Sequence, residues 1–186
     1  KYKGILINIM NTRMKIRYVS DLHLEFLENF PIIRSNDIDH DKYASATNDD
    51  LISDNNLIDE EIDLDINAKV LVLAGDIGNP YQDLYENFLV DVSKNGDFDK
   101  IFMITGNHEY YAHGNTIMDT NIHIKNLINT NNLENVIFLD NDYYIYGRFR
   151  FVGTTLWSNI TKGHKTKYLT NCFFQIKDFN KEEIEL

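Results

Sequence analysis

The sequence predicts an α/β domain built around a parallel sheet, and three apolar segments carry this prediction. Residues 14–20 alternate between apolar and polar side chains, as a half-buried strand does. Residues 69–74 and 101–105 are continuous apolar runs, which are typical of parallel strands that helices cover on both faces. Apolar residues between these two runs recur at helical spacing, so we expect a strand–helix–strand unit of about 30 residues.

The remaining elements are predicted from capping residues, turn residues and apolar periodicity. Asn79 and Pro80 predict the start of the first helix, because Asn is a favourable cap and Pro suits the first helical position. We expect Gly96 to end that helix. Further along, the patterns predict a helix over 116–128, strands over 136–139, 143–146 and 150–154 with a hairpin at Gly147, a polar loop over 158–167, and a charged segment over 176–186 that can begin a helix.

The length of 186 residues suits one ordinary domain, but its charge is unevenly spread. Residues 35–65 contain 11 of the 29 acidic residues and one of the 18 basic residues, and so carry most of the net charge of −11. This acidic, Asn-rich composition predicts an insertion without a packed core. We therefore divide the chain into an N-terminal extension (1–13) and one domain (14–186) that contains the insertion. The rest is nearly neutral and offers no basic groove, so nucleic acid is not a favoured partner.

The single cysteine and the short apolar runs bear on the cellular location of the protein. Cys172 excludes an internal disulfide framework, and its apolar context favours a packing role for a free thiol in a reducing environment. No apolar run approaches the roughly 18 residues that a membrane span requires. Residues 5–10 form an apolar run that is too short for a signal peptide, and this run lacks a small-residue cleavage site. We therefore expect a cytoplasmic protein without a membrane partner.

Metal-binding residue types follow each of the three predicted strands. Asp21 and His23 follow the first strand, Asp76 follows the second, and Asn107 with His108 follow the third. Because the carboxyl ends of parallel strands open at one edge of a sheet, we expect these side chains to meet there. Carboxylates and imidazoles suit divalent ions such as Mn, Fe, Zn or Ni, and a pair of ions can activate water for attack on a phosphoryl group.

Each of these motifs also has an ordinary structural interpretation. An Asp-x-His triplet arises by chance in a chain with six His and many Asp, and Gly-Asp after a strand is usually a turn. Gly106-Asn107-His108-Glu109 is rarer, and its Gly allows a backbone turn that other residues resist. Their occurrence in order, each at the end of a strand, favours one shared metal site.

The order Asp-x-His, Gly-Asp, Gly-Asn-His-Glu resembles the calcineurin-like metallophosphoesterases. The flanking segments 14–26, 106–111 and 151–157 are similar to the small soluble bacterial-type branch of that superfamily. The resemblance implies an α/β/β/α sandwich and a hydrolase that acts on phosphate mono- or diesters through two divalent ions. Mn is the ion we expect, with Fe, Zn, Ni or Mg as alternatives.

The resemblance also assigns roles to the residues at the strand ends. It implies that Asp21 and His23 bind the first metal, that Asp76 bridges the two ions, and that Asn107 binds the second. His108 would contact the phosphate or protonate the leaving oxygen, a role that suits an imidazole. We expect Glu109 to support the loop and not to bind metal.

The chain departs from the family pattern in its remaining histidines. A later strand ending in His and a Gly-His-x-His segment are both absent from this sequence. We expect none of His40, His113, His123 and His164 to replace them as ligands. The fold is therefore expected to be incomplete at the C-terminus, with a missing C-terminal segment or a second chain completing the site. The alternative function is a truncated, non-catalytic protein that acts as a weak metal-binding or interaction module, and a nuclease-type phosphodiesterase is less favoured.

Overall fold

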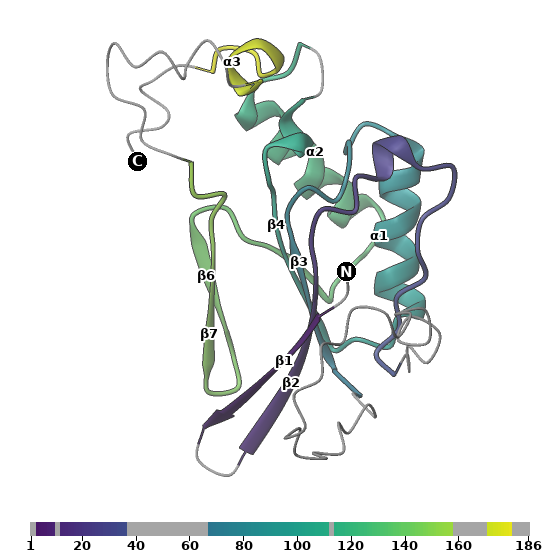
Figure 1. Cartoon of the computed structure of the whole chain (residues 1–186), viewed down its shortest axis with the longest axis vertical. Coiled ribbons are helices and arrows are strands. Elements are labelled where there is room, and N and C mark those ends of the chain that lie inside the picture. The colour runs from purple at the N-terminus through teal and green to yellow at the C-terminus, as the bar shows by residue number, and fades with distance from the viewer. Residues whose placement is uncertain (1–2, 10–11, 37–66, 112–113, 158–170, 180–186) are drawn as a thin grey trace, which may run out of the picture.

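The computed structural model describes residues 3–9, 12–36, 67–111, 114–157 and 171–179 (Figure 1). Most of the predicted acidic insertion, the predicted loop 158–167 and residues 180–186 lie outside these ranges. The described strands are β1 (Lys3–Ile9), β2 (Thr12–Val19), β3 (Val70–Ala74), β4 (Lys100–Ile104), β5 (Val136–Phe138), β6 (Asp142–Tyr146) and β7 (Phe149–Gly153). The described α-helices are α1 (Asp83–Asn95), α2 (Ile117–Thr130) and α3 (Cys172–Gln175).

A mixed five-stranded sheet in the order β1-β2-β3-β4-β5 forms the centre of the fold. Strands β2 to β5 are parallel, which confirms the predicted α/β class. Strand β1 pairs antiparallel with β2 and was not predicted, because the sequence pattern of residues 1–13 was interpreted only as an extension. Strand β2 accordingly begins at Thr12, two residues before the predicted start, since its first residues pair with β1.

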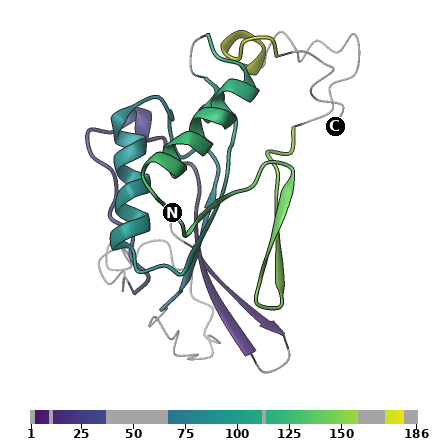
Figure 2. The ribbon, with the colours of Figure 1, turned by 180° about the vertical axis from the view of Figure 1, so that it is seen from behind.

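The sheet has helices on one face and a hairpin on the other (Figures 1 and 2). Helices α1 and α2 cover one face, whereas β6 and β7 form an antiparallel pair that packs on the opposite face through Phe102. The Phe102 ring stacks on Phe151 with ring centroids 3.9 Å apart. The apolar runs alone suggested helices on both faces, but aromatic residues of the hairpin bury the second face, which agrees with the α/β/β/α arrangement that the resemblance implied. The predicted hairpin itself is confirmed.

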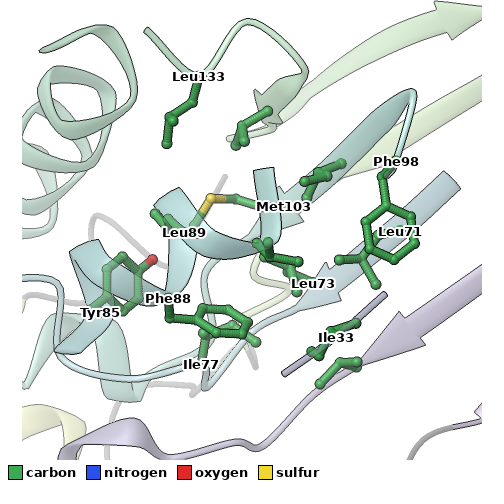
Figure 3. Close-up of a cluster of buried hydrophobic side chains, with 14 of the residues drawn as sticks. Ile33, Leu71, Leu73, Ile77, Tyr85, Phe88, Leu89, Phe98, Met103 and Leu133 are labelled. Atoms are coloured by element: carbon green, nitrogen blue, oxygen red, sulfur yellow. The ribbon is translucent and has the colours of Figure 1, made fainter. Parts of the chain in front are cut away.

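The main hydrophobic core lies between the sheet and the helices (Figure 3). Residues 71, 73, 101 and 103 alternate toward this face from β3 and β4. Helix α1 adds Tyr85, Phe88, Leu89 and Val92, which recur at helical spacing and are fully buried. Complete burial of one such side chain contributes roughly 1.5–3 kcal/mol, so this packing holds the strand ends in fixed register.

The helix boundaries differ from the predicted ones where side-chain hydrogen bonds compete with helix formation. Helix α1 begins after Gln82 and not after Asn79, because the Asn79 side chain accepts from the backbone of Tyr81 and forms a separate turn. Gly96 does cap the helix, but the left-handed residue is the next one, Asp97, with φ 60°. Helix α2 begins as predicted, with a capping box between Thr116 and Asp119.

The two flanks of the acidic insertion lie next to each other in the structure. The backbone N–H of Ala68 donates to the carbonyl of Ser35 at 2.8 Å, and Ser35 is fully buried. The chain thus leaves and re-enters the fold at one place. At the other end of the chain, α3 occupies Cys172–Gln175, so the helix lies just before the predicted charged segment. Among the described residues, no helix is long and apolar enough to cross a bilayer.

Candidate metal centre

The ends of β2 and β3 are joined by backbone hydrogen bonds just beyond the sheet. The Asp21 amide donates to the carbonyl of Gly75 at 3.1 Å, and the His23 amide donates to the carbonyl of Asp76 at 3.0 Å. Because β2 and β3 are parallel neighbours, both segments leave the sheet at the same edge. The backbone therefore places Asp21 and His23 beside Asp76.

All three of these residues have a left-handed backbone conformation. The φ angles are 55° for Asp21, 51° for His23 and 52° for Asp76. Asp and His adopt this region more often than most residues, but it remains uncommon outside glycine. Such positions concentrate at binding and catalytic sites, where the surrounding structure compensates for a cost of roughly 1–3 kcal/mol each. Three of them in one cluster support a functional site.

Two glycines allow the loops after β3 and β4 to touch. A Cβ on Gly75 would lie 2.6 Å from the backbone nitrogen of Gly106, and Gly75 itself has φ 85°. A Cβ on Gly106 would lie 2.7 Å from the Cγ atom of Asp76. Gly106 is not among the positive-φ glycines of the described residues, so the prediction that it allows an unusual backbone turn was wrong. Its missing side chain gives space to Asp76, and the backbone turn does not require glycine.

The donor atoms of Asp21, His23 and Asp76 form a cluster. One ligand atom from each residue lies within 4.8 Å of the other two, and the group ranges from half-buried to exposed. Two carboxylates and one imidazole are a donor set that fits borderline divalent ions such as Mn²⁺ or Zn²⁺. The residues present therefore fit the metal that the sequence implied.

His108 lies against both of these strand ends. Its backbone N–H donates to the Oδ1 atom of Asp76 at 2.8 Å. Its ring meets the ring of His23 edge-on, with centroids 4.3 Å apart. The structure thus brings together His108 and the Asp21, His23 and Asp76 cluster. A half-buried imidazole in this position can donate a proton to, or accept one from, a bound group.

Glu25 is a site residue that the sequence interpretation missed. Its Oε1 atom lies 2.8 Å from Nδ1 of His108 and 3.2 Å from Nδ1 of His23. Burial raises the pKa of Glu25, but hydrogen bonds from its own backbone, His108 and His23 outweigh burial and hold the pKa below its usual value. Glu25 is two residues after His23, and this spacing was the only signal for it in the sequence.

Glu109 holds the loop together, as expected. Its carboxylate accepts from the backbone amides of Asp76 at 3.1 Å, Ile77 at 2.6 Å and Gly106 at 2.7 Å. The side chain is completely buried, and burial raises its pKa to about 7 even though these backbone donors act in the opposite direction. Glu109 therefore links the loops after β3 and β4.

Asn107 is positioned by an aromatic neighbour. Its Nδ2 atom donates to the hydroxyl of Tyr111 at 2.6 Å, and that hydroxyl lies 3.3 Å from the Sγ atom of Cys172. Because the amide nitrogen is engaged in this way, the carbonyl oxygen is the atom of Asn107 that remains for a metal. Cys172 is buried among Tyr110, Ile176 and Phe179, which supports the expected packing role.

His123 has the ordinary structural role that we expected. Its ring stacks on Tyr81 with centroids 4.2 Å apart, and its Nε2 atom lies 2.9 Å from the carbonyl oxygen of Pro80. This His therefore joins α2 to the turn before α1. His40, His113 and His164 lie outside the described residues.

Comparison with known proteins shows which protein family the chain is similar to. A family model described as calcineurin-like phosphoesterase matches residues 14–182. A protein of Acanthamoeba polyphaga mimivirus, named uncharacterized protein L509, is 35% identical over 150 residues. That alignment covers 79% of this chain and 45% of the viral protein, so the chain spans less than half the length of this relative. No solved structure matches the chain significantly.

Proposed function

The chain belongs to the calcineurin-like phosphoesterase family, and on this premise we propose that it hydrolyses phosphate mono- or diesters through a binuclear metal centre. The observation that carries the proposal is the cluster of Asp21, His23 and Asp76 at the shared edge of β2 and β3. All three residues are held in left-handed backbone conformations, and such positions concentrate at binding and catalytic sites.

The proposed ligands divide between two ions. Asp21 and His23 would hold the first, Asp76 would contribute to both, and the carbonyl oxygen of Asn107 would hold the second. We propose Mn²⁺ as the working ion, because carboxylate, amide and imidazole donors together suit a borderline metal. When bound, the ions supply positive charge for the phosphoryl oxygens and lower the pKa of the attacking water.

The proposed catalytic residue is His108. Attack of water on phosphorus breaks the bond to the leaving oxygen, and the electron pair of that bond stays on the oxygen. A protonated His108 transfers its Nε2 proton to this oxygen, and the water loses a proton to solvent as the new phosphorus–oxygen bond forms. The hydrogen bond from the backbone of His108 to Asp76 fixes the position of this residue relative to the proposed bridging ligand.

A pair of matched variants tests the metal centre. Asp76→Asn removes the proposed bridging charge, whereas Asp142→Asn changes an exposed Asp in β6 that has no part in the site. We expect Asp76→Asn to weaken Mn²⁺ binding by a factor of 10 or more in calorimetric titration and to abolish hydrolysis of aryl phosphates. Asp142→Asn should change neither. Unchanged Mn²⁺ binding by Asp76→Asn would contradict the proposed ligand set.

The same titration separates the enzyme from the alternative function. A truncated, non-catalytic protein would bind Mn²⁺ weakly and hydrolyse nothing, whereas the proposed centre requires two bound ions per chain for activity.

We further propose a cytoplasmic location, on the basis of the free thiol of Cys172.

A further inference from the structure

Glu25 is held in place by the backbone around it. It lies in a 3-10 helix, η1 (Leu24–Phe26), that begins directly after the left-handed His23. The amide of Leu24 donates to the carbonyl of Ile77 at 2.9 Å, and the Leu24 side chain is almost fully buried. A Cβ on Gly78 would lie 2.8 Å from the Cβ of Leu24, so the loop after β3 packs closely against η1. Glu25 therefore has a fixed position, unlike a glutamate on a surface loop.

One oxygen of this carboxylate contacts two imidazoles. Oε1 lies 2.8 Å from Nδ1 of His108 and 3.2 Å from Nδ1 of His23, and the Glu25 side chain is only 13% exposed. The other oxygen, Oε2, is buried and has no hydrogen-bond partner within the described part of the chain. The charge of Glu25 is therefore directed at the two histidine rings.

A carboxylate accepts hydrogen bonds and, when ionised, donates none. Each Nδ1 atom must then carry a hydrogen in order to bond to Oε1. In a neutral imidazole the other nitrogen, Nε2, is left as the atom with a free lone pair. We propose that Glu25 is a positioning residue that locks both His23 and His108 in the Nδ1-protonated tautomer, so that each ring presents Nε2 to the reaction.

The tautomer affects metal binding at His23 and proton transfer at His108, and this part of the inference rests on the proposed function. His23 can bind a metal only through an unprotonated nitrogen, and Glu25 leaves Nε2 in that state. His108 can gain and then donate a proton at Nε2 while its Nδ1 hydrogen stays on Glu25. Carboxylates that orient metal-binding histidines in this way typically change metal affinity or activity by roughly 10–100-fold when they are removed.

Nuclear magnetic resonance of the metal-free protein tests the tautomers without any need for activity. Side-chain ¹⁵N–¹H correlations are recorded at alkaline pH, so that the nitrogen that carries the hydrogen can be told from the one that does not. The signals are assigned with His23→Gln and His108→Gln. In the wild-type protein we expect both rings to carry the hydrogen on Nδ1. Either ring protonated on Nε2 would overturn the proposal.

Matched variants show whether Glu25 causes that tautomer. Glu25→Met removes the acceptor oxygens and keeps the length of the side chain, and Glu28→Met is the control, because Glu28 is exposed three residues further along the same segment. We expect both rings to shift toward the Nε2-protonated form in Glu25→Met and neither ring to shift in Glu28→Met. A change in neither ring, or in only one, would overturn the shared role. If Glu25→Met fails to fold, Glu25→Asp replaces it, since a side chain shorter by one methylene cannot reach both rings.

Titration with the diamagnetic ion Zn²⁺ provides a second readout. Coordination through Nε2 leaves the Nδ1–H signal of His23 in place, and Glu25→Met should bind Zn²⁺ about 10-fold more weakly or worse. The three residues His23, Glu25 and His108 also have donor atoms close enough to hold an ion themselves. Loss of both Nδ1–H signals on Zn²⁺ binding would show that arrangement and overturn the proposal. An inactive protein with the expected tautomers would contradict only the proposed function.

Discussion

The backbone amide of His108 donates to the Oδ1 atom of Asp76 at 2.8 Å, and this bond ties the loop after β4 to the residue after β3. The two segments approach closely enough that a Cβ on Gly106, two residues before His108, would lie 2.7 Å from Cγ of Asp76. The proposed acid and the proposed bridging ligand are therefore placed by one backbone contact. Their relative position depends on Gly106, because a side chain there would occupy the space of Asp76.

Substitution of Gly106 by Ala should disturb both the packing of these two loops and the position of Asp76. The added methyl group must displace Asp76, so we expect Gly106→Ala to lower the free energy of unfolding by about 2 kcal/mol and to weaken Mn²⁺ binding at least about 10-fold. Gly147→Ala is the control, because Gly147 has φ 59° in the hairpin turn with open space around it. It should cost roughly 1–2 kcal/mol for its backbone conformation and leave Mn²⁺ binding unchanged. Equal Mn²⁺ affinities for the two variants would show that the Gly106 contact does not position Asp76.

Glu109 should contribute to stability through its three backbone donors. Gln at this position has one acceptor oxygen, and its amide group then faces at least one backbone N–H that no longer has a partner. We expect Glu109→Gln to lower the free energy of unfolding by about 1–3 kcal/mol in urea titration of the metal-free protein. The measurement is made at about pH 5, and the difference should shrink as the pH rises to about 7, because a raised folded-state pKa means that the wild type loses stability as this carboxyl ionises. Glu134→Gln, at an exposed position before β5, should have no comparable effect.

The ion pair between Arg34 and Asp91 should make stability depend on acid pH. Nη1 of Arg34 lies 2.8 Å from Oδ2 of Asp91, and this hydrogen bond holds the pKa of Asp91 below its ordinary value. A carboxyl whose pKa is lower in the folded state contributes stability above the unfolded pKa, and that contribution is lost as the pH falls through the folded pKa. The difference in unfolding free energy between wild type and Asp91→Asn should therefore be about 0.5–1 kcal/mol at neutral pH and shrink below about pH 4.

The control for this titration is Asp142→Asn, since Asp142 is exposed and has no basic partner among the hydrogen bonds of the described residues. Its difference from wild type should stay flat over the same pH range. A difference for Asp91→Asn that grows on acidification would contradict the assigned sign.

The sequence was sufficient for the parts of the site that depend on strand order. Apolar runs locate β3 and β4, and the rule that parallel strands end at one edge places Asp21, His23 and Asp76 together. Glu25 was beyond this reasoning, because its contact with His108 joins residues 83 positions apart through two loops. No periodic pattern records such a contact. It depends on the left-handed backbone at His23, which turns the following residues back toward the loop after β4.

Similar limits explain why the role of Gly106, the presence of β1 and the start of α1 were not predicted correctly. Gly106 was interpreted from backbone freedom, although its role is to leave space for Asp76, and only the packed structure reveals that contact. Strand β1 pairs with β2 through backbone hydrogen bonds that a single apolar run does not specify. Asn79 suits a helix cap in general, yet its side chain bonds to Tyr81 first, so local competition moved the start of α1.

The hydroxyl of Tyr111 should determine which atom of Asn107 is offered to a metal. It accepts from Nδ2 of Asn107 at 2.6 Å and is itself 3.3 Å from the Sγ atom of Cys172. Tyr111→Phe removes this partner and leaves the side-chain amide free to rotate, so that its nitrogen competes with its oxygen for the metal position. We expect the affinity for the second Mn²⁺ ion to fall about 3- to 10-fold, by roughly the 0.5–1.5 kcal/mol that one hydrogen bond contributes. Tyr143→Phe, which removes an exposed hydroxyl in β6, is the matched control and should bind both ions as the wild type does. Calorimetric titration of the two variants measures this difference, and equal second-ion affinities would show that Tyr111 does not orient Asn107.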